Sequence, residues 1–151
     1  MIKREQIIQS IYNILEGAMI ANKFVLFRNK EFDYEMNEEK LILLFDGESK
    51  VIDTVYSPRI DTIEQAIEIE LYLNKELAEN EINMELAKFE ESVRQSLSSY
   101  DICVPLVPSV DTTTDIMQLS LTPSETETLD PENGQPLKKS SFNVLVVFDD
   151  V

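Results

Sequence analysis

Carboxylates are the residues of this sequence that could most readily do chemistry. Asp and Glu make up 29 of its 151 residues, against 13 Lys and Arg, which gives a net charge of −16 at pH 7. Several close carboxylate pairs could bind a hard divalent cation through oxygen ligands. These pairs are Glu68 with Glu70, Asp111 with Asp115, and Asp149 with Asp150. Because carboxylates are so frequent, such pairs also arise by chance, and a solvated charged surface is the alternative for each.

The segment DPENG at residues 130–134 has the composition of a calcium-binding loop. It lacks the regular alternation and the distal glutamate of such a loop, so a plain turn is the better interpretation. A two-carboxylate hydrolase would need a concave site that separates two carboxyl pKa values, and no motif indicates one. We therefore expect no catalytic residue and no bound cofactor, with a divalent cation such as Mg²⁺ only as an aid to assembly.

Histidine is absent from the sequence, and cysteine occurs once, as Cys103. This composition excludes a Cys-His or Ser-His pair, an imidazole-based zinc site, a thiolate cage and an internal disulfide. The apolar residues that follow Cys103 predict a buried, inert thiol. Three glycines are too few to build a glycine-rich phosphate loop. We therefore expect a protein that is not an enzyme.

The acidic charge also limits the partners that the protein could bind. No basic stretch is longer than the pair Lys138-Lys139, so we expect no direct sequence-specific binding of nucleic acid and no attraction to acidic membranes. The first residues, MIKREQ, are charged and lead directly into an amphipathic segment, which is not the pattern of a signal peptide. No apolar run approaches the roughly 20 residues of a membrane span. We expect a soluble protein made in the cytoplasm.

Two segments have apolar residues at helical spacing. Residues 3–18 form the first, which should end near Gly17, and the second begins at about residue 77. The apolar face of the first helix consists of Ile7, Ile11, Ile14, Leu15 and Ala18, and that of the second consists of Ile82, Leu86, Phe89, Val93 and Leu97. A length of 151 residues is that of one ordinary domain, so we expect residues 1–151 to fold as a single domain.

The stretch TIEQAIEIELYLNKE, residues 62–76, alternates apolar and polar side chains. Its beginning could also be a helical face, but such a face would need an apolar residue at position 70, where the sequence has Glu70. The odd positions stay apolar as far as Leu73, so a period of two predicts a strand. Its odd residues from Ile63 onward would then enter a core.

Several other segments have the composition of strands. The apolar run KFVLF lies at residues 23–27, and Asp46-Gly47 between two β-rich runs predicts a hairpin with strands near 40–46 and 50–56. IMQLSL and the final SFNVLVVFDDV are further strands, and residues 122–140 have no periodicity, which predicts a long loop. The order of elements indicates an α+β fold with a mixed or antiparallel sheet of four to six strands and two helices packed on one face.

Two helices can cover only one face of such a sheet. The strands at 41–45 and 142–148 are apolar at both parities, which is typical of strands buried on both faces, and a neighbouring subunit would be an economical cover. We therefore predict an oligomer interface on the second face, with a row of glutamates at its wetter margin. The predicted interface residues are Glu64, Glu68, Glu70, Tyr72, Leu145 and Val147. A solvated strand face is the alternative for the glutamates.

The same segments, taken in order, resemble a known family. They are IIQSIYNILEGAM, LILLFDG, AIEIELYLNKELAENEINMELAKFEESV, LVPSVDTTTDIMQLSLTP and SFNVLVVFDD. Together they cover most of the chain and are similar to the phage tail terminator proteins of lambda-like siphophages, the minor tail protein U family. The likeness is one of pattern and order rather than of a single invariant signature.

This resemblance implies a small α+β virion protein of the tail, made in the bacterial host cytoplasm. It would form a ring, with a hexamer expected, that caps the tail tube and joins it to the head, so its partners would be itself, the tail tube protein and the head-tail connector protein. An acidic ring lumen would repel DNA phosphates. The hairpin region and the segment 122–140 would dock along the ring axis. The residues implied in axial docking are Tyr56, Arg59, Glu125, Glu127, Asp130 and Glu132.

The main alternative is an acidic inhibitor or DNA mimic, whose carboxylates would occupy a nucleic-acid-binding enzyme. The net charge favours this class, whereas the strands that are apolar at both parities favour a subunit of an assembly. A mimic would concentrate its acidic residues on a convex ridge, and a terminator would place them around a ring axis.

Overall fold

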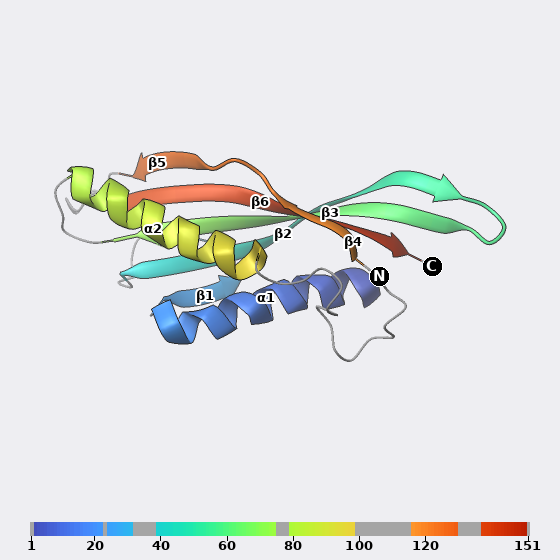
Figure 1. The fold of residues 1–151 in the computed structure, drawn as a ribbon, viewed down its shortest axis with the longest axis horizontal. Coiled ribbons are helices and arrows are strands. Elements are labelled where there is room, and N and C mark those ends of the chain that lie inside the picture. The colour runs from blue at the N-terminus through green and yellow to red at the C-terminus, as the bar shows by residue number, and fades with distance from the viewer. Residues whose placement is uncertain are drawn as a thin grey trace.

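The computed structural model describes residues 2–22, 24–31, 39–74, 79–98, 116–129 and 137–150 (Figure 1). Two helices and six strands lie within these ranges. In chain order they are α1 (Ile2–Asn22), β1 (Val25–Arg28), β2 (Lys40–Val55), β3 (Ile60–Leu73), α2 (Glu79–Ser98), β4 (Ile116–Leu121), β5 (Glu125–Leu129) and β6 (Leu137–Asp150).

All six strands belong to one sheet, in the order β1-β2-β3-β6-β4, with β5 also paired to β6. The pair β1–β2 is parallel and the other pairs are antiparallel. β4 and β5 share the outer side of β6, where β4 pairs with its second half and β5 with its first half. The predicted α+β class with a mixed sheet is confirmed, and six strands lie at the upper end of the predicted number.

Both helices pack on the same face of the sheet. Their apolar residues form one buried cluster with the residues of β2, β3 and β6 that point toward this face, such as Leu44, Ile69 and Val144. The predicted apolar face of α2 is confirmed, since all five of its residues are buried. α1 continues to Asn22, so the predicted end near Gly17 is wrong. Gly17 is exposed and has open space around it, and a glycine in such a place weakens a helix without ending it.

β3 is a central strand whose alternation follows the sequence pattern. The odd residues Ile63, Ile67, Ile69, Leu71 and Leu73 are all buried. β2 and β6 flank β3 on either side over almost its whole length, and this pairing fixes the face toward which each side chain points. The prediction of a strand with its odd positions in the core is confirmed.

The predicted hairpin turn at Asp46-Gly47 is wrong. β2 runs without interruption through both residues, and the chain reverses only at residues 56–59. The register of the β2–β3 pair shifts between Asp46 and Ser49, where two residues of β2 lie opposite Ala66 alone, so Gly47 belongs to a β-bulge. A Cβ atom on Gly47 would lie 2.6 Å from the carbonyl oxygen of Ala66, which explains why the position needs glycine.

The predicted long loop at 122–140 is wrong for much of its length. Residues 125–129 form β5, and residues 137–140 begin β6. β5 has the sequence ETETL, and its first four residues are exposed, so it lacks the apolar alternation by which strands are recognised. Its backbone nevertheless pairs with β6 over five residues.

The second face of the sheet carries its own buried cluster. Leu41, Leu43, Tyr72 and Leu137 are buried there, with Phe45 partly buried beside them. The apolar residues of both parities in the strand 41–45 are therefore covered within a single chain. The argument that this strand needs a neighbouring subunit as cover is wrong, because side chains of adjacent strands on this face cover one another.

The bulge generates a prediction about stability. Gly47→Ala should lower the free energy of unfolding by about 1–3 kcal/mol, because the added methyl group meets fixed backbone atoms of Ala66. Gly17→Ala is the matched control, since nothing lies within 4 Å of its Cβ, and it should raise the free energy of unfolding by up to about 1 kcal/mol. Urea unfolding of both variants checks this. Equal effects of the two substitutions would contradict the role assigned to Gly47.

Candidate assembly surface

The β2–β3 hairpin extends beyond the helices as an arm, defined here as residues 48–62 (Figure 1). β1 pairs with β2 only from Leu41 to Leu44. The side chain of Asn29 then accepts a hydrogen bond from the backbone N–H of Asp46, at 3.0 Å. Beyond Asp46, the outer edge of β2 has no strand partner in the described part of the chain. The arm therefore has one open edge.

The arm carries most of the exposed large apolar side chains of the described residues. These are Val51, Ile52, Val55 and Tyr56, with Tyr56 73% exposed, and Met84 on α2 is the fifth. The register places Val51 opposite Ile63, on the helix-covered face, and Val55 opposite Ile60, on the other face. Exposed apolar side chains gathered on a projecting element, on both of its faces, are typical of a surface that another protein covers.

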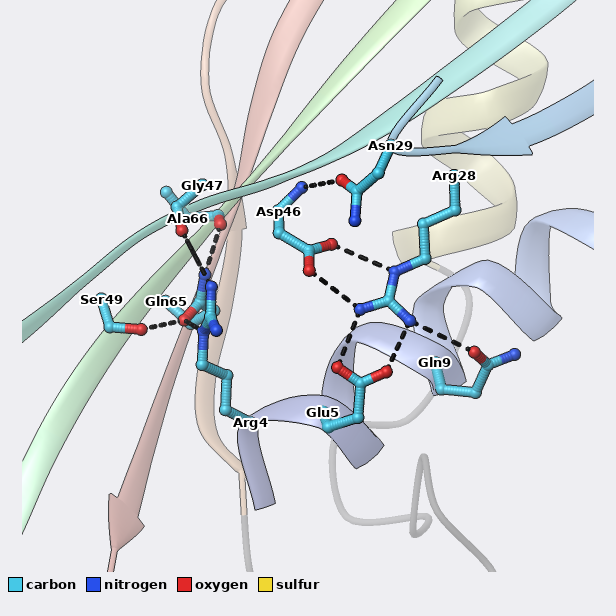
Figure 2. A network of polar contacts seen from close by, with 10 residues as sticks. All are labelled: Arg4, Glu5, Gln9, Arg28, Asn29, Asp46, Gly47, Ser49, Gln65 and Ala66. Carbon is cyan, nitrogen blue, oxygen red and sulfur yellow. Dashed lines mark hydrogen bonds and ion pairs between the residues drawn. The ribbon is translucent and has the colours of Figure 1, made fainter. Parts of the chain in front are cut away.

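A buried amide fixes the root of the arm (Figure 2). Gln65 of β3 is fully buried, and its side-chain nitrogen donates to the carbonyl oxygens of Gly47, at 3.0 Å, and Ala66, at 2.7 Å. Its side-chain oxygen accepts from Arg4 Nε, at 2.6 Å, and from the hydroxyl of Ser49. All four hydrogen-bonding positions of the amide are used, so its burial costs little. The bulge is thereby held to β3 and to the first turn of α1.

A second contact ties the same region to α1. Figure 2 shows the guanidinium of Arg28, at the end of β1, between the carboxylates of Glu5 and Asp46. Its nitrogens donate to both oxygens of Glu5, at 2.6 and 2.9 Å, and to both oxygens of Asp46, at 3.1 and 3.0 Å. A longer bond of 3.4 Å reaches the side-chain oxygen of Gln9. The five N–H groups of the guanidinium thus all have acceptors.

The two ion pairs of Arg28 shift the pKa values of both carboxyl groups. The hydrogen bond from Arg28 lowers the pKa of Glu5 below its usual value. Partial burial acts to raise the pKa of Asp46, but the hydrogen bonds to Arg28 and Asn29 outweigh it, so that pKa is also lowered. Both carboxylates therefore stay charged, and their ion pairs with Arg28 connect α1, β1 and the bulge.

An acidic pocket of about 280 Å³ lies on the sheet away from the arm. We define it by Glu68 of β3, Glu125 of β5, and Ser141 and Asn143 of β6. Glu68 lies opposite Asn143, and Glu125 lies opposite Ser141, so the two carboxylates flank β6 on the same face of the sheet. Neither carboxylate forms an ion pair with a described residue.

Next to this pocket, Glu70 and Tyr72 are buried in a polar cluster. Lys139 Nζ lies 3.0 Å from Glu70 Oε1, and the hydroxyl of Tyr72 donates to Glu70 Oε2 at 3.2 Å. Burial and the charge of Glu70 together raise the pKa of Tyr72 above its usual value. The Tyr72 hydroxyl therefore stays protonated and serves as a donor.

The structure places the predicted site residues in several environments. Glu64, Glu68, Glu70 and Tyr72 share one face, as do Leu145 and Val147, which are half-buried. Within this set Glu68 is exposed, Glu64 is half-buried, and the other two β3 residues are buried. Tyr56 and Arg59 lie at the exposed tip of the arm, and Glu125 and Glu127 are exposed on β5. Asp130 and Glu132 lie outside the described residues, and an interface role for the whole set stays a prediction.

Sequence reasoning missed Val51, Ile52 and Val55 as surface residues, and Gln65 as the residue that orders the bulge. The arm was missed because its turn was assigned to Asp46-Gly47. Gln65 did give a signal, since it is the one polar residue at a core position between Ile63 and Ile67. A buried polar residue in an apolar pattern indicates a specific hydrogen-bonding role.

Two classes of site are not found in the described part of the chain. No group of three or more Asp, Glu, Cys or His side chains there could hold a metal ion. Among the same residues, neither helix has a stretch that is both long enough and apolar enough to cross a membrane. Cys103 and the pair Asp111 with Asp115 fall outside the described residues.

Comparison with known proteins gives a likeness of fold. No protein-family model matches the chain, and no curated protein matches it. A chain from a solved structure, the virion of a native gene transfer agent (GTA) particle, superposes with a TM-score of 0.53 over 93% of this chain and 92% of that chain. The two sequences are 8% identical. The two chains share a fold over nearly their whole lengths.

The Arg28 contacts generate a prediction about pH. Because the folded-state pKa values of Glu5 and Asp46 lie below their unfolded-state values, the unfolded chain binds more protons in acid. Stability should therefore fall as the pH is lowered from about 5, and Arg28→Gln should make this fall shallower as well as lowering stability at pH 7. Urea unfolding at a series of pH values measures the slope. Lys88→Gln on the exposed side of α2 is the control, and identical slopes for Arg28→Gln and the wild type would refute the assignment.

Proposed function

We propose that the protein is a structural component of a phage-like virion and that it acts in the tail as a terminator. In this role it forms a ring, expected to be a hexamer, that caps the tail tube and joins it to the head. Its partners are further copies of itself, the tail tube protein and the head-tail connector protein, and it performs no enzymatic chemistry. The arm is the single observation that carries this proposal.

The arm supports assembly because it exposes Val51 on one face and Val55 on the other. A hairpin with apolar side chains on both faces gains most when a partner surrounds it, as happens between packed subunits. The contacts of Gln65 and Arg28 hold the root of the arm in place. The backbone of the arm would therefore lose little conformational entropy when a partner binds.

The fold gives independent support. The solved chain with which this protein superposes belongs to the virion of a gene transfer agent particle, and the superposition covers 93% of this chain. The order of elements that resembles the tail terminator family points to the same kind of assembly. Identification of a tail terminator in particular rests on that resemblance, and the fold likeness supports the broader class of virion proteins.

The charge of the chain shapes how such a ring would assemble. Each copy carries a net charge of −16, so copies repel one another at low ionic strength. Added salt shortens the Debye length to about 10 Å at 0.1 M and weakens this repulsion. Association should therefore increase with salt, or with Mg²⁺ at lower concentrations. An acidic lumen would keep DNA from adhering during passage.

An acidic inhibitor that mimics DNA is the alternative. Such a protein would make contact through its carboxylates, whereas the projecting element of this structure is rich in exposed apolar side chains. The arm also carries Lys50 and Arg59 against Glu48, Asp53 and Asp61, so its charges nearly balance and it is not the concentrated acidic ridge that a mimic requires. The arm therefore favours assembly over mimicry.

The proposal predicts a multimer whose formation depends on the arm. The mass of the wild-type protein, measured by light scattering after size exclusion over a range of protein, salt and Mg²⁺ concentrations, should rise toward six subunits as charge is screened. Val51→Ser/Val55→Ser should remain a monomer under the same conditions, because it removes apolar surface that the partner covers.

Met84→Ser is the matched control, since Met84 is an exposed apolar residue on α2 and not on the arm. It should assemble like the wild type. Substitutions at such exposed positions change stability by only about 0.5 kcal/mol, so all three proteins should unfold at similar temperatures. A wild-type protein that stays monomeric under every condition would refute the ring and favour the inhibitor.

A further inference from the structure

Arg59 at the arm tip and the carboxylates of the acidic pocket have opposite charges. We propose that the arm of one copy docks on a second copy of this chain, with Arg59 entering the acidic pocket between Glu68 and Glu125. This contact rests on the ring described above and names the surfaces that form it. It assigns the arm tip to the neighbouring subunit, whereas the resemblance assigned Tyr56 and Arg59 to axial docking.

Arg59 is placed to bind carboxylates outside its own chain. It lies in the turn of the arm, and its side chain is 67% exposed. Its Nε donates to Asp61 Oδ1 at 3.2 Å, and the same oxygen accepts from the hydroxyl of Thr54 at 2.9 Å. The two terminal nitrogens of Arg59 form no hydrogen bond with a described residue. Their four N–H groups have the fork geometry that binds carboxylates.

The pocket supplies unneutralised carboxylates at a fixed place. Glu68 and Glu125 line it without an ion pair to any described residue, whereas neighbouring Glu70 is already paired with Lys139. The Ser141 hydroxyl and the Asn143 side chain add oxygen acceptors at its wall. A guanidinium would be surrounded by two charges and two neutral acceptors. A third carboxylate, which would favour a bare divalent cation, is missing from the described residues here.

The wall of the pocket is held rigidly before any partner binds. Arg94 of α2 donates to the Thr122 carbonyl and to Ser124 Oγ, both at 2.6 Å, and its guanidinium lies over the ring of Phe142 at 4.3 Å. The hydroxyl of Thr122 accepts from the backbone N–H of Asn143 at 2.8 Å, and the backbone N–H of Thr122 donates to the carbonyl oxygen of Asn143 at 2.9 Å. The connection between β4 and β5 is therefore fixed, and docking would order little beyond the side chains of Arg59, Glu68 and Glu125.

The pocket cannot take the arginine of its own arm. Ile60 and Glu68 both lie on β3, and eight steps of about 3.3 Å place them roughly 26 Å apart along the strand. This span exceeds the length of an arginine side chain, so Arg59 must come from another molecule. In the proposed ring the arm of each copy docks on the pocket of the next copy, which is a heterologous contact, and such a contact closes a ring when its rotation divides a full turn.

Charge reversal in two separate variants tests the contact. Arg59→Glu reverses the tip, and Glu68→Gln/Glu125→Arg reverses the pocket. Each variant alone should lose association by about tenfold or more in its dissociation constant, because like charges would face each other at every contact. An equimolar mixture should recover to within about threefold of the wild type, since each tip would then meet an opposite pocket in the alternating partner. Glu127→Arg, an exposed reversal on β5 outside the pocket, is the matched control and should associate normally.

The outcomes separate this contact from the ring itself. An oligomer that forms equally well in both single variants, or a mixture that stays dissociated, overturns the contact and leaves the ring standing. A wild-type protein that remains monomeric overturns both. If Arg59→Glu self-associates normally but no longer binds the tail tube protein, the contact between copies is overturned and the arm tip is assigned to axial docking. Calorimetric binding of Mg²⁺ to the wild type and not to the pocket variant would identify a cation as the occupant and overturn the contact.

Discussion

One buried amide holds the β-bulge at which the arm begins. The side chain of Gln65 joins the bulge of β2, the backbone of β3 and the start of α1 through four hydrogen bonds. A group this deeply buried is stable only while every partner is present, because each missing hydrogen bond would leave a desolvated polar atom. The amide therefore specifies one arrangement of these three elements. The salt bridges of Arg28 with Glu5 and Asp46 stabilise the same arrangement, because they connect β1 and α1 to β2 beside the bulge.

The sequence predicted those elements in which one physical effect dominates. Apolar residues at a period of two identified β3, and apolar residues at helical spacing identified α2, because burial of one face decides both structures. The turn at Asp46-Gly47 was misplaced because glycine serves tight turns and close backbone contacts equally, and only the position of Ala66 in space distinguishes them. β5 was missed because its exposed residues leave no apolar pattern, and its stability comes from pairing with a distant segment.

The candidate surfaces were likewise predictable where they depend on local sequence pattern and unpredictable where they depend on tertiary contacts. The glutamates of one face could be recognised from the alternation of β3. That Glu70 forms an ion pair while Glu68 forms none with a described residue depends on Lys139, in a strand far along the chain. The acidic pocket likewise forms only where β3, β5 and β6 meet. Residue types and local spacing indicate which face is charged, whereas neutralisation of individual charges is a property of the tertiary structure.

Beyond Asp46, the outer edge of β2 has no strand partner among the described residues, and this has a consequence for aggregation. An unpaired strand with exposed Val and Ile is a template on which other chains can add strands and aggregate. In the arm these residues are interspersed with Glu48, Lys50 and Asp53, all exposed, so an incoming apolar strand would have to strip water from charged side chains. These charged side chains therefore oppose the addition of further strands to the exposed apolar residues of the arm.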